Sequence, residues 1–477
     1  MFPRSTTISD SAVQENHEPH LKRGLSNRHL QLIAIGGAIG TGLFMGSGKT
    51  ISVAGPSVIL VYAIIGFMLF FVMRAMGELL LANLNYKSLR DAVSDILGPG
   101  AGFVTGWTYW FCWIATGMAD IVAITGYTQY WWPEIPLWLP GVLTIALLFA
   151  LNLAAVRLFG EMEFWFAIIK IVAIVSLIVV GLFMVVTAFE SPNGTTAQFN
   201  NLIEHGGFFP NGITGFLAGF QIAIFAFVGI ELAGTAAAET ENPTKTLPRA
   251  INSIPIRIVV FYVLALAVIM MVTPWDQVRA DNSPFVQMFA LAGIPAAAGI
   301  INFVVITSAA SSANSGIFST SRMLYGLSLE GAAPKRWSRL SKNLVPARGL
   351  TFSVICLIPA VGLLYAGGTV IEAFTLITTV SSVLFMVVWS YILVAYIVYR
   401  RNSPELHKKS IFKMPGGVVM AVVVLVFFAA MLVVLSLEPD TRAALIATPV
   451  WFIILGIGWL SIGGAKGAKH RSQITSH

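Results

Sequence analysis

Two ionisable residues lie inside stretches of this sequence that are otherwise apolar. Lys170 is within IIKIVAIVSLIVVG, and Glu231 is within FQIAIFAFVGIELAG. An ionisable side chain is costly in an apolar medium, so such residues often mark the path of an ion or a solute. A buried lysine can release a proton and take it up again, and a buried glutamate can gate a pathway or carry a proton. Both residues are therefore candidates for proton exchange.

Each of these residues also has a purely structural interpretation. Lys170 lies about nine residues, or about 13 Å, inside its apolar segment, so its long stem could snorkel to the surface. Glu231 could instead cap loose backbone at a break in its helix. Asp120, in GMADIVAIT, could pair with another helix, and the sequence leaves its role open. Three further glutamates fall near the ends of apolar segments and are expected at the membrane surface: Glu78, Glu161 and Glu163.

Glycine is concentrated in the apolar stretch QLIAIGGAIGTGLFMGSG, residues 31–48. Gly36, Gly37, Gly40 and Gly42 are close together there, and each glycine weakens a helix by about 1 kcal/mol relative to alanine. A helix that breaks here exposes main-chain N–H and C=O groups, which an apolar medium tolerates only beside a cavity or a bound solute. The half-helix that begins near Gly42 would direct its positive end at an anion such as a carboxylate.

A second apolar segment is interrupted in the same way. Gly229, Glu231 and Gly234 lie in the middle of the sixth segment, five segments after the first. Paired interruptions in two halves of a chain indicate an inverted repeat with a solute site between the breaks. The alternative is that these glycines only allow helices to pack closely.

The eighth apolar segment is rich in hydroxyl groups. It contains TSAASSANSGIFSTSR, in which Ser308, Ser312 and Ser315 follow helical spacing and share one face. Together they could present oxygens to an ion or an ammonium group. Serines in membrane helices often bond only to their own carbonyls, so that alternative stays open. The tenth segment has a weaker version of the same pattern: Thr375, Thr378, Thr379, Ser381 and Ser382.

The elements that position these residues are apolar helices. The chain is 56% hydrophobic and 11% charged, whereas a soluble domain has about 25% charged residues. Twelve hydrophobic segments of spanning length predict an all-α, polytopic membrane protein. They are residues 29–54, 57–82, 101–132, 138–156, 162–189, 212–238, 251–273, 290–326, 350–366, 371–400, 415–437 and 446–464.

The pairing of the first and sixth segments divides the chain into parts. Residues 29–189 form the first repeat of five helices, and residues 212–401 form the second. Residues 415–464 add two helices, and residues 1–28 and 465–477 are polar tails on the cytoplasmic side.

The positive charges predict the orientation in the membrane. With both termini in the cytoplasm, the outer loops contain only Lys49, Arg279 and Arg442, and most of the 29 Lys and Arg residues fall on the inner side. This bias follows the positive-inside rule. It also accounts for the net charge of +7 through contact with anionic lipid, so no nucleic-acid partner is expected.

Several functional classes have no support in the sequence. The two cysteines, Cys112 and Cys356, stand alone in apolar runs, and the seven histidines lie outside the predicted spans except for His29, the first residue of the first segment. No catalytic constellation, metal-ligand spacing or phosphate-binding GxxxxGK[ST] loop is present. We therefore expect neither an enzyme nor a metal or organic cofactor, and the long output domain of a solute sensor is missing as well.

The residues assembled above resemble a known family. GGAIGTGLF, Lys170, FAFVGIELAG and ETENPTKTLPRAI are similar to motifs of the bacterial amino acid transporter family, within the amino acid–polyamine–organocation superfamily. The resemblance extends from about Leu21 to Gly464. It implies the leucine-transporter fold, with five-plus-five inverted repeats, and proton-coupled uptake of a small amino acid across the bacterial inner membrane by alternating access.

The resemblance also implies a set of site residues. Main chain of Ile39, Gly40, Thr41 and Gly42 would bind the substrate carboxylate, and carbonyls in both breaks would bind its ammonium group. Phe225 would be an aromatic gate, and Lys170 would take the place of a sodium ion in sodium-coupled relatives. The residues implied for the ammonium group are Ala38, Ile39, Phe225, Ala226 and Val228.

The implied substrates are D-alanine, D-serine and glycine, with the proton as the coupling ion. Two alternatives stay open: the substrate could be another neutral amino acid, or the protein could exchange one amino acid for another. The sequence also leaves the oligomeric state open.

Overall fold

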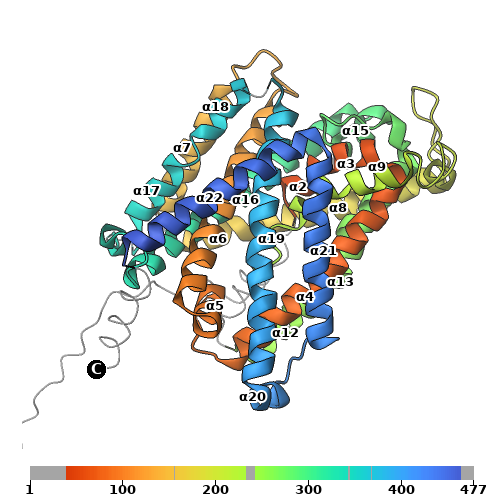
Figure 1. Cartoon of the computed structure of the whole chain (residues 1–477). Helices are drawn as coiled ribbons and strands as arrows, with labels where there is room; N and C mark the ends of the chain where they lie inside the picture. Colours follow the sequence, from red (N-terminus) through yellow and green to blue (C-terminus); the bar gives the residue numbers. More distant parts are fainter. Residues whose placement is uncertain are drawn as a thin grey trace, which may run out of the picture.

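The computed structural model describes residues 39–86, 88–154, 156–232, 242–341, 344–366 and 368–463, with the backbone alone at 154 and 156–160. Among these residues the regular elements are helices, and the one pairing of extended backbone is an isolated bridge between Glu190 and Thr196. The predicted all-α class is confirmed (Figure 1). The tails at 1–28 and 465–477 lie outside the described residues, as do Ala38 and Gly234.

The predicted segments correspond to observed helices. Nine helical runs in the described part of the chain are long and apolar enough to cross a membrane. The first of them, Thr41–Ala82, includes the described part of two predicted segments. Two shorter apolar helices, Trp138–Leu153 and Gly212–Phe227, fall in the fourth and sixth predicted segments. The twelve predicted segments therefore each contain a helix.

Three long helices form the centre of the molecule. Helix α6 (Pro99–Thr128) packs along both α16 (Pro295–Leu329) and α19 (Val370–Asn402). Large aromatic side chains fill the space between α6 and α19, where Trp113 meets Phe385 edge to face. A short helix, α5 (Leu89–Leu97), precedes α6 and is closed at its start by a capping box of Ser88 and Asp91.

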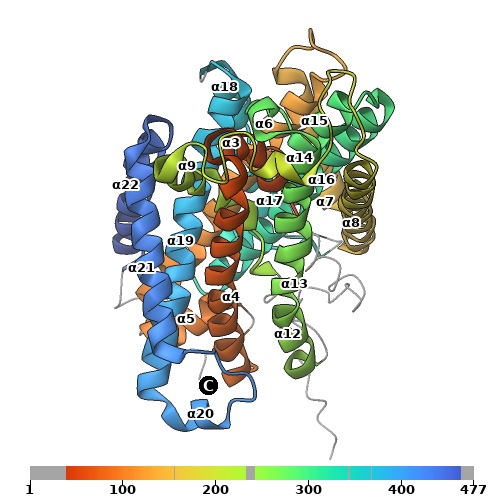
Figure 2. The same cartoon turned by 90° about the vertical axis from the view of Figure 1, so that its right-hand side faces the viewer.

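The remaining elements surround this centre (Figures 1 and 2). They are α2 (Thr41–Phe44), α3 (Gly46–Ala54), η1 (Gly55–Ser57), α4 (Val58–Ala82), α7 (Trp138–Ala154), α8 (Val156–Val186), η2 (Phe199–Leu202), α9 (Gly212–Ala218), α10 (Phe220–Ala223), η3 (Phe225–Phe227), α12 (Pro243–Asn252), α13 (Ile254–Ile258), a π-helical stretch η4 (Val259–Leu264), α14 (Ala265–Val272), η5 (Trp275–Gln277), α15 (Pro284–Leu291), η6 (Lys335–Ser338), α17 (Ala347–Ile355), α18 (Pro359–Ala366), α20 (Pro404–Lys409), α21 (Gly417–Leu437) and α22 (Pro439–Ser461).

The two ends of the bundle are easy to distinguish. Helices α3, α9 and α15 lie at one end, which the charge pattern predicts to face outward, and α12 and α20 lie at the other (Figures 1 and 2). These are called the outer and inner ends below. Gly55, with φ +60°, turns the chain at the outer end between α3 and α4, in a backbone conformation that other residues rarely adopt.

Several helix boundaries differ from the prediction. Proline and glycine account for two of them: Gly293, with φ +78°, separates α15 from α16, and Pro359 begins a second helix within the ninth segment. Helix α8 begins at Val156 rather than at residue 162. Lys170 is therefore 14 residues from the start of α8, which corresponds to about 21 Å of helix. In the apolar part of this helix, Glu161–Val186, Lys170 is nine residues from the start, as the sequence predicted.

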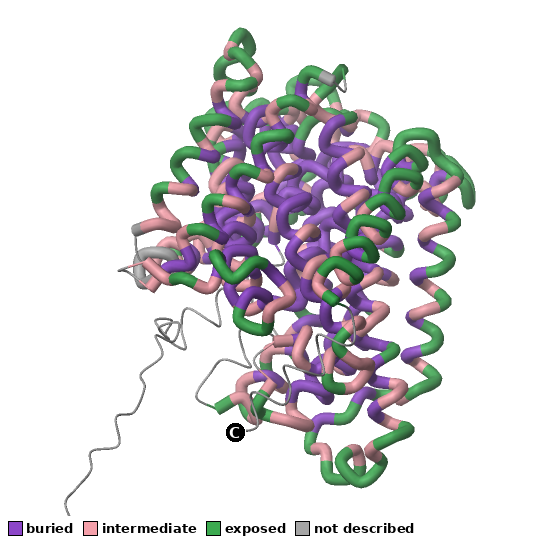
Figure 3. The backbone as a smooth tube through the Cα atoms, turned by 60° about the vertical axis from the view of Figure 1, so that its left-hand side comes forward, coloured by how far each residue is buried: buried purple, intermediate pink, exposed green. Residues whose placement is uncertain are grey.

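Buried positions are concentrated in the middle of the molecule, and exposed ones follow the peripheral helices and the loops (Figure 3). The exposed positions of α21 and α22 are mainly apolar, as at Val419, Val426, Ile446 and Ile453. Apolar side chains on the outside of a helical bundle are those expected to contact lipid tails.

Candidate functional site

The sixth predicted span is interrupted, as the sequence indicated. Helix α10 and the tighter turn η3 end at Phe227, and the backbone of Val228 is extended, with ψ 135°. Gly229 follows with φ +94°, a conformation that costs glycine little and other residues much. The chain therefore leaves the helical path at Val228 and Gly229, and the predicted break is confirmed.

The first predicted span begins its described course with a bend at Ile39 and Gly40. Helix α2 starts at Thr41, one residue before the predicted start, and Gly40 provides no side-chain cap. The first N–H groups of a helix have no acceptor within it, so those of Thr41 and Gly42 are available for another partner. The carbonyl of Gly40, by contrast, already accepts hydrogen bonds from the backbone N–H groups of Leu43 and Phe44.

The two breaks lie against each other. A Cβ atom placed on Gly42 would be 2.5 Å from the Cα atom of Ala226 and 2.6 Å from its nitrogen, which is too close for any side chain. At Gly40 the same test finds only the Ser312 hydroxyl, at 3.8 Å. The chain is therefore tightly packed on the Gly42 side of the first break and open on the Gly40 side.

Two of the carbonyls expected to bind an ammonium group already accept a hydrogen bond. The Ser308 hydroxyl donates to the carbonyl of Ile39 (3.1 Å), and the Tyr262 hydroxyl donates to that of Ala226 (2.9 Å). A carbonyl oxygen has two lone pairs, so each can accept one further donor. Ser308 thus bonds to another helix rather than to its own.

Asp120 of α6 contacts the start of α2. Its Oδ1 accepts a bond of 2.7 Å from the Thr41 hydroxyl, and the residue is completely buried. Ser312 of α16 also interacts with this carboxylate. The role of Asp120, which the sequence left open, therefore includes anchoring the first break to α6.

Removing this anchor should destabilise the protein. In Thr41→Val the shape of the side chain is kept but the hydroxyl is lost, and a buried acceptor left without a donor costs about 1–3 kcal/mol. We expect the free energy of unfolding to fall by that amount, measured by thermal unfolding in detergent. Thr41→Ser keeps the hydroxyl and serves as the control. An unchanged stability in Thr41→Val would show that the bond to Asp120 contributes little.

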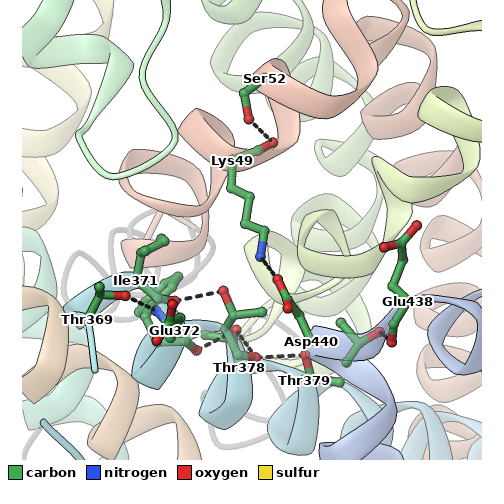
Figure 4. Close-up of polar contacts among 12 residues, drawn as sticks. Lys49, Ser52, Thr369, Ile371, Glu372, Thr378, Thr379, Glu438 and Asp440 are labelled. Atoms are coloured by element: carbon green, nitrogen blue, oxygen red, sulfur yellow. Dashed lines mark hydrogen bonds and ion pairs between the residues drawn. The ribbon is translucent and has the colours of Figure 1, made fainter. Parts of the chain in front are cut away.

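The breaks are covered on the outer side by aromatic packing. Phe225, the predicted aromatic gate, is buried and meets Phe374 of α19 edge to face, with 5.9 Å between the ring centroids. Farther out, Lys49 of α3 forms an ion pair with Asp440 of α22, which ties the outer part of the first span to the last helix (Figure 4). These contacts connect the two interrupted spans to α19 and α22.

Lys170 does not snorkel. The residue is 2% exposed, and its Nζ donates to the hydroxyl of Ser311 on α16 at 3.1 Å. Its positive charge also interacts with the carboxylates of Glu163 and Asp120. Lys170 is thus held between α8 and α16 at mid-helix.

Glu163 was expected near the inner end of its span, and the structure shows that its side chain is buried inside the protein. The residue is 5% exposed, and it accepts bonds from Ser311 (2.7 Å) and from the Asn314 side chain (2.9 Å). Ser315, one of the three predicted hydroxyls, interacts with the same carboxylate. Glu163 is therefore bound to α16 through three of its side chains.

Glu78 lies near the inner end of its helix, as expected, and its side chain is buried by the protein. It is completely buried at the inner end of α4, where His407 of α20 contacts one oxygen and the amide of Met414 donates to the other at 2.8 Å. The loop between α19 and α21 folds back over α4 and encloses it. Glu161, by contrast, is half-buried.

Glu231 lies just after the second break and is completely buried. It accepts a bond of 3.3 Å from the Tyr109 hydroxyl, and it interacts with the backbone at Gly229 and at its own position. These backbone contacts support the capping role that the sequence left open. The gating or proton-carrying role stays a prediction.

Most hydroxyls of the tenth segment form hydrogen bonds within their own helix. Thr375, Thr378, Thr379 and Ser382 donate to carbonyls of their own helix. Only Ser381 reaches another helix, where it bonds to the carbonyl of Cys112 and pairs with Thr116. The hydrogen bonds of this segment therefore fit the structural interpretation of its hydroxyls.

Comparisons with known proteins all indicate the same family. The family model described as amino acid permease matches residues 29–469. The D-serine/D-alanine/glycine transporter of Escherichia coli is 66% identical over 454 residues, 95% of this chain and 97% of the relative. An amino-acid permease of Bacillus subtilis is 52% identical over 91% of this chain and 94% of the relative, and an aromatic amino acid transport protein of Escherichia coli is 40% identical over 94% and 97%.

Proposed function

Because this chain belongs to the amino acid permease family, and is thus a multi-pass membrane transporter rather than an enzyme, we propose that it is a proton-coupled symporter for small zwitterionic amino acids. Its substrates are D-alanine, D-serine and glycine, the compounds named for the relative with 66% identity. The observation that carries this proposal is the close approach of Gly42 in α2, just after the bend at Ile39 and Gly40, to Ala226 in η3, just before the break at Val228 and Gly229.

Main-chain groups at the two breaks suit a zwitterion. The N–H groups of Thr41 and Gly42 can donate to a carboxylate, and the remaining lone pairs of the Ile39 and Ala226 carbonyls can accept from an ammonium group. Ala38, Gly40, Phe225 and Val228 complete the predicted site. Main chain recognises only the groups that all amino acids share, so neighbouring side chains such as Phe225 set the size limit.

The inward movement of a proton supplies enough energy for accumulation. One charge crossing the membrane field releases roughly 2.3 kcal/mol per 100 mV, which sustains about a 50-fold gradient of substrate. Lys170 is the residue that exchanges this proton in our proposal, because it is buried at mid-helix beside hydroxyl and carboxylate groups.

The proposed arrangement in the bacterial inner membrane follows the charges. Both termini lie in the cytoplasm, because the loops at the inner end contain clusters such as Arg400 and Arg401 and Lys408 and Lys409. The helices of residues 29–189 and 212–401 form two inverted repeats that contribute one break each, and the helices of 415–464 are added to them. Alternating access then proceeds around the fixed site.

Uptake into proteoliposomes tests the proposal. Vesicles with the purified protein should accumulate labelled D-alanine when the outside is made acidic, and their interior should acidify at the same time. Unlabelled D-serine and glycine should compete, and L-aromatic amino acids should not. An obligate exchanger would stay idle in empty vesicles, and accumulation without any proton entry would contradict proton coupling.

A further inference from the structure

Three side chains on α8 and α16 form a continuous hydrogen-bonded chain. Lys170 Nζ donates to Ser311 Oγ at 3.1 Å, and the Ser311 hydroxyl donates to Glu163 Oε2 at 2.7 Å. All three residues are buried. A serine hydroxyl has one proton to donate and two lone pairs to accept, so a single orientation satisfies both bonds.

The order of donors and acceptors is that of a proton relay. If Lys170 passes a proton to the Ser311 oxygen while Ser311 passes its own proton to Glu163, one N–H bond and one O–H bond break and two O–H bonds form. The ammonium becomes a neutral amine, the carboxylate becomes a carboxylic acid, and the serine is unchanged. An ion pair is thus replaced by two neutral groups, which costs little in a poorly solvated interior because the desolvation penalty applies only to charges.

Neighbouring residues hold the acceptor in place. Asn314 donates to the other oxygen of Glu163 at 2.9 Å, and Asn152 of α7 donates to Asn314 at 2.8 Å. Ser315 interacts with the same carboxylate, and on the far side Asp120 of α6 faces Lys170. The carboxylate is thus fixed by two helices besides its own.

The relay has a direction along α8. Glu163 precedes Lys170 by seven residues, two turns and about 10 Å nearer to the N-terminal end of the helix. That end is the inner one in the proposed orientation. A proton that reaches Glu163 is therefore closer to the cytoplasm than one on Lys170.

We propose that Ser311 and Glu163 form the exit path by which Lys170 releases its proton toward the inner end. This inference rests on the proposed function, since it names the route of the coupled proton. Ser311 transmits the proton, and Glu163 receives it.

The relay can be tested by comparing net uptake with exchange. Exchange of external for internal D-alanine needs only the loaded, protonated carrier, whereas net uptake needs proton release in every cycle. For Ser311→Ala we expect proton-driven D-alanine uptake to fall about 100-fold, the low end of the effect of a positioned proton-transfer group, with exchange largely retained. Ser311→Thr should restore uptake, because it keeps the hydroxyl. Ser321→Ala is the matched control, since that buried hydroxyl on α16 bonds to its own helix.

Glu163→Gln is the second variant, because it keeps the shape of the side chain while removing the proton acceptor. It should show the same loss of uptake with exchange retained. Parental uptake in either variant overturns the relay, and so does an equal loss of uptake and exchange, which would indicate a structural role. If the parent protein exchanges D-alanine but admits no protons, the proposed coupling fails, and that result is distinct from a failure of the relay alone.

Discussion

Lys170→Ala should abolish the concentrative uptake of D-alanine and leave the protein in the membrane. The variant retains the two breaks and their main-chain groups, so the substrate can still bind and cross down its own gradient. It lacks the group that exchanges the coupled proton, so an imposed pH gradient should no longer drive accumulation. The measurement is the ratio of internal to external labelled D-alanine in proteoliposomes under that gradient, which should stay near one. Full proton-driven accumulation in Lys170→Ala would exclude lysine from the mechanism.

The contact of Lys170 with Glu163 adds a control that separates coupling from stability. Removing one partner of a buried charge pair typically costs about 3–5 kcal/mol, because the other charge is left uncompensated. The double variant Lys170→Ala with Glu163→Gln is free of that charge, so it should recover thermal stability without recovering uptake. Lys408→Ala, at an exposed pair with Glu405 in α20, is the control for loss of a lysine elsewhere. Exposed pairs contribute only about 0–1 kcal/mol.

The sequence predicted the elements of this site better than their partners. Glycines and an acid in apolar segments indicated both breaks, because glycine weakens helices wherever it stands. Lys170 was identified because a charge in an apolar run is costly in any fold. These signals are local, so they do not depend on knowing which helices meet. The contact between Gly42 and Ala226 joins residues far apart in the chain, and no local pattern reveals it.

The hydroxyls of α16 show that helical spacing alone does not predict the partner of each side chain. Helical spacing selects Ser308, Ser312 and Ser315, but the partner of Lys170 is Ser311. Residues three and four apart both lie on one helical face, so spacing alone does not decide between Ser311 and Ser312. The structure assigns them to different neighbours: Ser311 faces α8, and Ser312 faces Asp120 and the first break.

The burial of Glu163 against α16 was not predicted. The spacing of Glu163 from Lys170 contained a usable signal, since residues seven apart lie two turns apart on the same face. No pattern in the sequence indicated that the carbonyls of Ile39 and Ala226 accept hydrogen bonds from the hydroxyls of Ser308 and Tyr262. Which carbonyl accepts which hydroxyl depends on the packing of helices that are distant in the chain.

Gly42→Leu should abolish substrate binding, and the structure changes the reason for that expectation. The sequence suggested that bulk at Gly42 would fill the space beside the bound carboxylate. In the structure a side chain at Gly42 meets the backbone of Ala226 at 2.5 Å, so the two breaks must move apart. Losing even one charge-assisted hydrogen bond costs about 1.5–3 kcal/mol, or about 10- to 100-fold in affinity. Binding of labelled D-alanine to the purified protein measures this loss.

Gly40 provides the matched control within the same break. Its φ of −132° suits any residue, and an added Cβ would meet only the Ser312 hydroxyl, at 3.8 Å. Gly40→Ala should therefore keep the parental unfolding temperature, whereas Gly42→Ala should lose about 1–3 kcal/mol of stability through overpacking. The open side of Gly40 is also where a carboxylate can approach the N–H groups of α2, so Gly40→Leu should weaken D-alanine binding without unfolding the protein. Parental affinity in both leucine variants would remove the first break from the binding site, because no pose beside α2 tolerates both additions.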